Sequence, residues 1–155
     1  MKPLAKKPSP AAVAALRQAT AIAPKRKKAS DGLLPSAAHV KQNPNSDHNT
    51  GLAADITHDP HNGIDCSEMF VKLRDDKRVL YLIFNGRIWS PERGLREYTG
   101  PNKHVKHIHI SIKAKFANDT SPWFPWLGQP KKLAKLKAGL ARKPKKKEVA
   151  SPKED

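Results

Sequence analysis

The chain has 155 residues, of which 37% are hydrophobic and 28% charged, and its formal net charge is +16. The length fits one domain of ordinary size, and no apolar run is long enough for a transmembrane helix. Because Cys66 is the single cysteine, a disulfide scaffold is also excluded.

The excess charge lies at the two ends of the chain. Residues 1–30 carry 8 basic and no acidic residues, and residues 131–155 carry 10 basic and 3 acidic residues. Residues 31–130 carry 12 basic and 11 acidic residues. We therefore expect a nearly neutral domain between two cationic ends.

The first ten residues, 1–10, are rich in Pro and Lys, and we expect them to be disordered. Ser9 followed by Pro10 is typical of a helix start, and it predicts a helix that begins at Pro10 and continues to about residue 21. The same Ala-rich stretch has the outline of a secretory signal, but Arg17 and Gln18 interrupt its apolar core. A helix at the edge of the domain is therefore favoured over a signal.

The middle of the chain predicts an irregular loop followed by short elements. Residues 35–51 are rich in Asn, Asp, Ser, His and Pro, and a loop of this length is often functional; His39 within it is a candidate for lining a site. Apolar patterns and the Asn85-Gly86 turn signal then predict, in chain order, a strand at 52–57, a helix at 65–75, an apolar strand at 79–84, a return strand at 87–89 and a last strand at 107–113. This order predicts an α+β fold with a small antiparallel sheet flanked by helices.

After residue 126 the composition becomes dominated by lysine. Leu133, Leu136 and Leu140 keep helical spacing, which allows a short amphipathic helix. We expect the rest of residues 127–155 to be a basic, mostly disordered tail.

The last predicted strand carries two histidines on one face. Strand side chains alternate, so His107, His109 and Ser111 share a face, and the intervening isoleucines share the other. The two imidazoles would lie about 7 Å apart along the strand, close enough to serve one site. A solvated strand face also tolerates histidine, so this pattern alone leaves both interpretations open.

A second polar segment favours the metal interpretation. His48 lies in the polar loop and Asp55 lies in the strand that follows, with Gly51 between them to let the chain turn. Together with one strand histidine they would form a set of two histidines and one aspartate with an open fourth position. That arrangement is typical of catalytic zinc.

These residues also resemble a known family. The pattern consists of two motifs, Ser46-x-His48-x-x-Gly51-x-Ala53-x-Asp55 and His107-x-His109. It resembles the zinc peptidases of the D-Ala-D-Ala carboxypeptidase and murein endopeptidase group, the hedgehog-like metallopeptidases, in a phage or bacterial branch. The resemblance covers about residues 11–126, which would form the zinc peptidase domain.

The resemblance implies a role for each matching position. The zinc ligands would be His48, Asp55 and His109. His107 would lie beside the metal and assist proton transfer, and His104 on the adjoining loop is the second catalytic candidate. Many members carry a catalytic Glu where this chain has Lys106, so the identity of the general base stays open.

The implied activity is hydrolysis of peptide bonds in bacterial peptidoglycan, as in an endolysin. Bound zinc would lower the pKa of its water to about 7, which makes hydroxide available for attack on a peptide carbonyl. We expect a monomer without a membrane span that acts at the bacterial cell wall or periplasm, made in the host cytoplasm and released through a holin.

The basic ends would bind anionic wall polymers or lipopolysaccharide. They also support a rival hypothesis, a basic nucleic-acid- or envelope-binding protein with a non-catalytic His cluster. Residues 31–130 are nearly neutral and contain no recognised nucleic-acid-binding motif, so nucleic acid is the less favoured partner.

Overall fold

The structure, a computed structural model, describes residues 3–127. The chain divides into a unit that ends at Phe124 and a second unit that begins at Pro125, and all the helices and strands below lie in the first. These are α1 (Pro10–Ile22), α2 (Ala37–Gln42), η1 (Asp47–Thr50), β1 (Ala53–Thr57), η2 (Pro60–Asn62), α3 (Cys66–Lys72), η3 (Leu73–Asp75), β2 (Val79–Phe84), β3 (Arg87–Ser90), β4 (Gly94–Glu97), β5 (His107–Ile112) and η4 (Ala114–Phe116).

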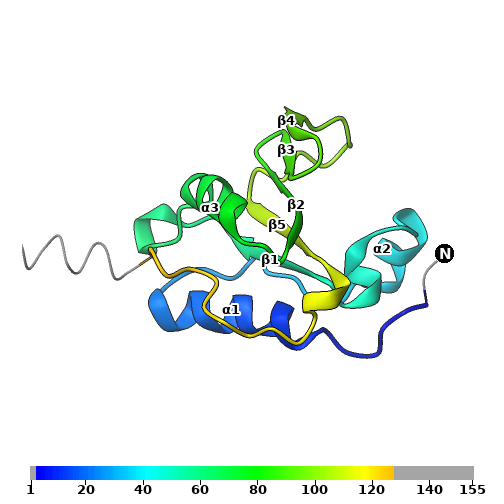
Figure 1. The fold of residues 1–155 in the computed structure, drawn as a ribbon, viewed down its shortest axis with the longest axis horizontal. Helices are drawn as coiled ribbons and strands as arrows, with labels where there is room; N and C mark the ends of the chain where they lie inside the picture. Colours follow the sequence, from blue (N-terminus) through cyan, green and yellow to red (C-terminus); the bar gives the residue numbers. More distant parts are fainter. Residues whose placement is uncertain (1–2, 128–155) are drawn as a thin grey trace, which may run out of the picture. The chain divides into compact units, whose positions relative to one another are not determined.

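The strands form one antiparallel sheet in the order β1-β5-β2-β3-β4 (Figure 1). Helix α1 packs against β1, and α3 packs against β2 and β5. The predicted α+β fold, a small antiparallel sheet with flanking helices, is confirmed. Because β5 inserts between β1 and β2, the last strand within residues 3–127 lies near the middle of the sheet.

Helix α1 begins where the sequence predicts. The Ser9 hydroxyl accepts a hydrogen bond from the Ala12 N–H at 3.2 Å, and Pro10 occupies the first helical position. The helix buries a face made almost entirely of alanine, which lets it approach the sheet closely. The buried residues of this face are Ala11, Ala12, Ala14, Ala15 and Ala19.

Strand β5 shows the predicted alternation. Ile108, Ile110 and Ile112 are at most 1% exposed and form the centre of the core. On the same side, Cys66 at the start of α3 donates from its thiol to the Ile56 carbonyl at 3.4 Å. The isoleucine face is thus the face that α3 covers, and the histidines lie on the other.

Two parts of the fold differ from the predictions. The loop at residues 35–51 contains the short helix α2, which Ser36 caps by accepting from the His39 N–H at 3.1 Å, and the turn η1. Strand β4 was not predicted; it pairs with β3, and its Leu95 side chain stays 46% exposed. Helix α2 and strand β4 bury little apolar surface, so their sequences show little hydrophobic periodicity.

The segment that we expected to be disordered, residues 1–10, is in part tied to the η1 turn. The Ala5 N–H donates to the Asn49 carbonyl at 2.7 Å, and the Ser9 N–H donates to the Gly51 carbonyl at 3.0 Å. The partners lie more than forty residues away, so local composition gave no sign of them.

A buried arginine holds the other end of the unit. The Arg78 guanidinium pairs with Asp76 at 2.7 Å and donates to the main-chain carbonyls of Asp119, Ser121 and Pro122 at 2.8–3.1 Å. It also stacks over the ring of the fully buried Trp123, 3.7 Å from the ring centroid. This clamp fixes the segment that follows β5 against the rest of the core.

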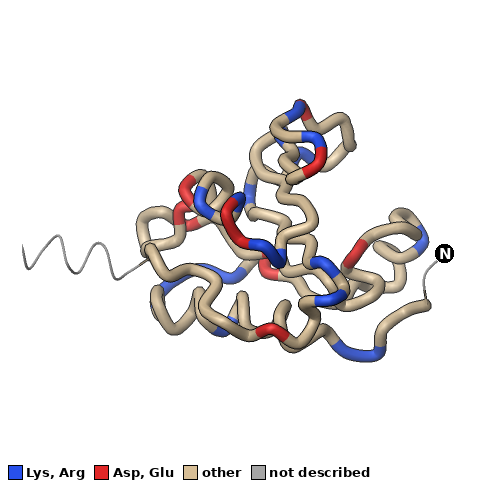
Figure 2. The backbone as a smooth tube through the Cα atoms, in the orientation of Figure 1, with Lys and Arg blue, Asp and Glu red and all other residues tan. Residues whose placement is uncertain are grey.

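Lys and Arg lie along the whole described chain, whereas no Asp or Glu precedes Asp31 (Figure 2). No helix within residues 3–127 has the length and hydrophobicity needed to cross a membrane. The expected tail helix and the tail itself, residues 128–155, lie outside the described residues.

Candidate metal centre

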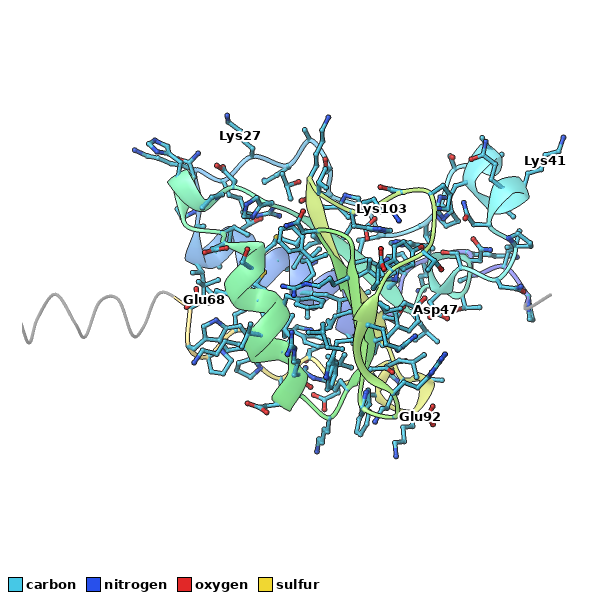
Figure 3. All side chains as sticks on the ribbon, turned by 90° about the horizontal axis from the view of Figure 1, so that it is seen from above. Lys27, Lys41, Asp47, Glu68, Glu92 and Lys103 are labelled. Atoms are coloured by element: carbon cyan, nitrogen blue, oxygen red, sulfur yellow. The ribbon has the colours of Figure 1, made fainter. Side chains whose placement is uncertain are left out.

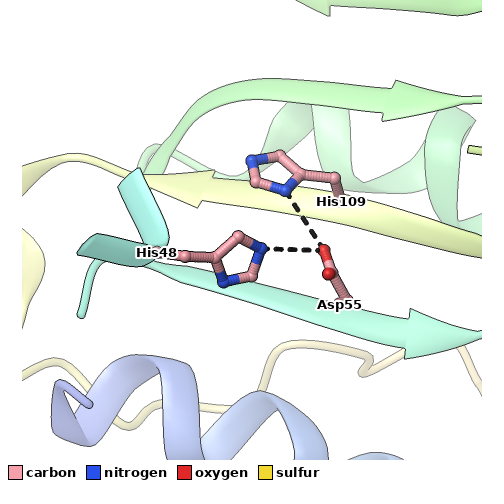
Figure 4. A group of neighbouring side chains, drawn as sticks. All are labelled: His48, Asp55 and His109. Carbon is pink, nitrogen blue, oxygen red and sulfur yellow. Dashed lines mark hydrogen bonds and ion pairs between the residues drawn. The ribbon is translucent and has the colours of Figure 1, made fainter. Parts of the chain in front are cut away.

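The three predicted ligands meet on the histidine face of the sheet (Figure 4). His48 comes from η1, Asp55 from β1 and His109 from β5. One ligand atom from each residue lies within 4.8 Å of the other two. Asp55 Oδ1 is at the centre, 3.1 Å from His48 Nε2 and 3.1 Å from His109 Nδ1.

The sheet itself places two of these ligands side by side. In the antiparallel ladder of β1 and β5, Asp55 lies directly opposite His109. Directly opposed side chains on one face are in contact range, so the pairing brings this carboxylate to this imidazole without any loop.

A short bridge on the outer edge of β1 makes room for the carboxylate. The main chain of Gly32 pairs with that of Asp55 through two hydrogen bonds of 2.8 and 3.1 Å. A Cβ atom at Gly32 would lie 3.1 Å from Asp55 Oδ2, so a larger residue here would press on the ligand.

The basic stretch before Gly32 is an anchor rather than a free linker. Arg26 is 5% exposed, and its guanidinium makes two hydrogen bonds with the Asp31 carboxylate at 3.0 and 2.7 Å. Asp31 in turn accepts from the Thr57 N–H at 3.0 Å and the Thr57 hydroxyl at 2.8 Å. This network holds the segment that contains Asp31 and Gly32 against β1, next to Asp55.

Capping and a left-handed glycine build the turn that carries His48. The Ser46 hydroxyl accepts from the His48 N–H at 3.2 Å, and Gly51 ends the turn with φ of 74°. The His48 ring is fixed by its Nδ1, which donates to the Leu33 carbonyl at 2.6 Å. A carbonyl only accepts, so Nδ1 carries a proton, and Nε2 is the nitrogen that faces Asp55.

The carboxylate of Asp55 dominates the electrostatics of the cluster. Burial disfavours its charged form, but the hydrogen bond from His109 and the contact with His48 outweigh burial and hold the pKa of Asp55 well below its usual range. Burial also disfavours protonation of His48, yet the Asp55 carboxylate outweighs it and raises the pKa of His48. A centre of positive charge is therefore favoured beside Asp55.

The residues fit a zinc ion. His48 Nε2 is buried, and although it lies at ion-pair distance from Asp55, no described atom completes a well-aligned hydrogen bond with it. A buried nitrogen without such a partner costs free energy unless another group satisfies it. Two imidazole nitrogens and one carboxylate oxygen are a donor set that zinc prefers, and the Leu33 carbonyl supplies the orienting contact that ligating histidines usually have.

His107 and His104 lie beside the three ligands. His107 Nε2 is 3.6 Å from Asp55 Oδ2, farther than either ligand nitrogen is from Oδ1. Burial lowers the pKa of His107, with attraction to Asp55 as the weaker opposing effect. The imidazole of His107 is therefore neutral at pH 7, and it can both accept and donate a proton.

The loop before β5 holds His104 in a left-handed conformation, with φ of 56°. Its N–H donates to the Asn102 side chain at 3.0 Å and its Nδ1 donates to the Asn102 carbonyl at 2.7 Å. The ring centroid lies 4.8 Å from that of His107 and 5.7 Å from that of His109. Burial, reinforced by His109 and His107, lowers the pKa of His104 to about 4.

All five predicted site residues line one cleft of about 940 Å³. One wall comes from α2 and the loop after it, including His39 and Asn43, and the other comes from the loop before β5, including Tyr98 and Asn102. Figure 3 shows Lys41 of α2 pointing away from the sheet. Lys106, the residue just before β5, is exposed and is not a lining residue of this cleft.

Two residues near His109 were missed by the analysis of the sequence. Tyr81 of β2 stacks on the His109 ring with centroids 5.5 Å apart. Burial, with the Asp47 carboxylate as a smaller contribution, raises the pKa of the Tyr81 hydroxyl to about 12. The apolar run of β2 gave no sign that Tyr81 would face the site, and Asp47 was read only as part of a polar loop.

Comparisons with known proteins give one match. The family model described as VldE, C-terminal domain, matches residues 9–109, a span that runs from the cap of α1 to the third candidate ligand. Comparison with curated proteins and with solved structures finds no match. Because the matched span is well over half of the chain, the chain belongs to the VldE C-terminal domain family.

Proposed function

We propose that this protein is a zinc-dependent peptidase that hydrolyses peptide bonds of bacterial peptidoglycan. The observation that carries the proposal is the convergence of His48, Asp55 and His109 within 4.8 Å on the wall of a large cleft. Structural zinc sites are usually closed by four protein ligands, whereas three ligands beside an open cleft suit a catalytic ion. When bound, zinc would supply a Lewis acid that activates water and polarises a carbonyl at neutral pH.

The chain's own residues supply the proton transfers. His107 is neutral at pH 7 and lies beside Asp55, so it can take a proton from the attacking water and return it to the leaving amine. His104 is held with its proton on Nδ1, which leaves Nε2 as an acceptor. Its low pKa of about 4 keeps it in this form near neutral pH.

The walls of the cleft suit a peptide. Amide side chains line both sides: Gln42, Asn43 and Asn45 on one, Asn102 on the other. A carboxamide both donates and accepts, as a peptide group does, so these side chains can pair with a peptide main chain. The resemblance of the Ser46–Asp55 and His107–His109 motifs to peptidoglycan peptidases supports this substrate class.

The test is hydrolysis of a soluble muropeptide by the purified protein with zinc. We expect new amino groups to appear, activity to be lost with a chelator and regained with zinc, and the His48→Ala variant to be inactive. A DNA-shift assay at physiological salt, run in parallel, tests the rival hypothesis of nucleic-acid binding. Binding of DNA by a zinc-loaded protein that cleaves no muropeptide would contradict the proposal.

The basic ends are proposed to hold the enzyme on anionic wall polymers or lipopolysaccharide. A variant that lacks residues 131–155 loses 10 basic residues. We expect it to keep full activity on a soluble muropeptide and to lose activity on intact wall, most strongly at low salt. Equal activity of both forms on both substrates would show that the tail does not target the wall.

A further inference from the structure

The loop that joins β4 to β5 is held at both of its ends by the turn between β2 and β3. Where the loop leaves β4, the Tyr98 N–H donates to the Gly86 carbonyl at 2.9 Å. Where it approaches β5, the Gly86 N–H donates to the Lys103 carbonyl at 2.8 Å. The Asn85 N–H donates to the His104 carbonyl at 2.9 Å, and the Lys103 ammonium donates to the Tyr98 carbonyl at 2.8 Å. The main chain of this cleft wall is therefore fixed at the residues that carry Tyr98 and His104.

The ring of Tyr98 lies directly on the main chain of Gly100. A Cβ atom at Gly100 would overlap the Tyr98 hydroxyl and the ring carbon that bears it. Gly100 is not among the described glycines with positive φ, so the absence of a side chain is needed here for space rather than for backbone freedom. The Tyr98 ring also meets the His104 ring edge to face, with centroids 5.6 Å apart and planes at 77°. The glycine and the imidazole together fix the place of the phenol.

The hydroxyl of Tyr98 is left for a ligand. Tyr98 is half-buried and lines the cleft, and no group within residues 3–127 forms a hydrogen bond with its hydroxyl. A phenol hydroxyl both donates and accepts, so it can pair with either half of a peptide group. Its ring adds apolar contact area, and a side chain that is already fixed loses little conformational entropy on binding.

Tyr98 lies two ring contacts away from the candidate metal centre. The His104 ring is 5.6 Å from the Tyr98 ring and 5.7 Å from the ring of the ligand His109, measured between centroids. An extended peptide spans about 3.3–3.6 Å per residue. A peptide group beside Tyr98 would therefore lie within about three residues of the carbonyl that bound zinc polarises.

We propose that Tyr98 is a substrate-contacting residue, whose hydroxyl pairs with a peptide group of the substrate within about three residues of the scissile bond. Gly100 is the positioning residue that gives the Tyr98 ring its room. The identity of the peptide rests on the proposed function. The contact itself requires no metal ion, so it can be measured in the metal-free protein.

The test measures binding of a fluorescently labelled muropeptide to the metal-free protein, in which a chelator prevents cleavage. Tyr98→Phe removes the hydroxyl and keeps the ring. We expect it to weaken binding about 3- to 10-fold, the contribution of one neutral hydrogen bond. Thr99→Ala is the matched control, because Thr99 is exposed and does not line the cleft. Its affinity should equal that of the wild type.

Gly100→Ala tests the positioning role. This variant keeps the Tyr98 hydroxyl but displaces the ring, so it should weaken binding at least as much as Tyr98→Phe does. In a Tyr98→Ala background it should have no further effect, because the ring that the Cβ would meet is gone. An equal loss of affinity in both backgrounds would contradict the positioning role, since Gly100 would then act through its own main chain.

The zinc-loaded protein separates this inference from the proposed function. There Tyr98→Phe should raise KM by the same factor and leave kcat nearly unchanged, because the contact is equal in the ground and transition states. If the metal-free variants differ as expected while the zinc-loaded wild type cleaves nothing, the contact stands and the peptidase proposal fails. If Tyr98→Phe changes neither the affinity nor KM, the contact is refuted and the peptidase proposal stands. A wild type that binds no muropeptide, with or without zinc, overturns both.

Discussion

The turn that carries His48 and the strand that carries His109 reach the same carboxylate by opposite means. Strand β5 is paired along its length with β1 on one side and β2 on the other, so main-chain hydrogen bonds on both sides set the place of the His109 backbone. The η1 turn has only four residues and depends on contacts from distant parts of the chain, including the Leu33 carbonyl and the N–H groups of Ala5 and Ser9.

This difference gives the candidate centre two unequal halves: strand β5 is the robust half, and the η1 turn is the fragile half. A ladder distributes its support over many hydrogen bonds, so losing one matters little. The turn concentrates its support in a cap, a left-handed glycine and a few long-range contacts, each of which matters. Substitutions in the two segments should therefore affect metal binding and folding in different proportions.

The largest effect should follow removal of a ligand from either half. Both His48→Ala and His109→Ala should lower zinc affinity more than 100-fold, since even loss of an orienting partner costs 10- to 100-fold. The two variants should differ in the metal-free state. His109→Ala removes the hydrogen bond between His109 and the buried Ser111 hydroxyl and should lower the free energy of unfolding by about 1–3 kcal/mol. His48→Ala should lower it less, and chelator competition with chemical unfolding measures both quantities.

Substitution of His107 should reduce catalysis without reducing metal binding. His107→Ala should keep zinc nearly fully bound and reduce turnover by roughly 10²- to 10⁴-fold, the usual contribution of a general acid–base group. Near wild-type turnover would assign His107 a packing role. Loss of zinc from this variant would show that the two strand histidines are assigned the wrong way round.

The fragile half should be sensitive to a single methyl group. Gly51 has φ of 74°, and a Cβ there would lie 3.0 Å from the Lys7 carbonyl oxygen. Gly51→Ala should cost about 2–3 kcal/mol of stability, from left-handed strain plus crowding, and should weaken zinc binding.

Gly86→Ala is the matched control for this effect. Gly86 has φ of 80° in the turn between β2 and β3, but a Cβ would meet no atom within 4 Å. It should cost about 1 kcal/mol and leave zinc affinity unchanged. Equal losses of zinc affinity in the two variants would show that the η1 turn has no special role in metal binding.

The smallest effect is expected on the far side of the sheet, at Cys66. Burial raises the pKa of this thiol to about 12, whereas an exposed thiol is half ionised near pH 9. Folding therefore opposes ionisation, and alkylation of the native protein at pH 9 should be slow and should proceed through opening of the sheet. His109→Ala should accelerate the reaction about fivefold or more, as expected from a loss of about 1 kcal/mol or more of stability, and His48→Ala should accelerate it less. Equal acceleration by both would show that the turn supports the core as strongly as the strand does.

Much of the fold and part of the site follow from local pattern. The cap at Ser9, the alternation in β5 and the Asn85-Gly86 turn are local signals, and each predicted its element closely. The same alternation put His107 and His109 on one face, and the spacing of the loop motif indicated His48 and Asp55. The places of these residues were predictable because strand alternation and the turn motif are local patterns, whereas the choice of His109 over His107 as a candidate ligand came from the resemblance to the zinc peptidases.

The rest depends on contacts that the sequence does not display. A β-bulge at Leu80 reverses the phase of β2, so Tyr81 reads as a core residue although it faces His109. In the sequence, Arg26 is one basic residue in a lysine-rich segment. Its role as an anchor follows only from the fold, which brings its partner Asp31 next to Thr57. The contacts of Ala5 and Ser9 with the η1 turn likewise arise only from the tertiary fold.

The position of β5 in the sheet also governs when the site can exist during synthesis. Asp55 and His109 are 54 residues apart, and β1 has no partner among the strands until β5 is made. A hairpin of β2 and β3 can form on the ribosome, but the carboxylate of Asp55 stays without its strand partner until the chain has emerged past β5. We therefore expect the three candidate ligands to come together only after β5 has been inserted between β1 and β2.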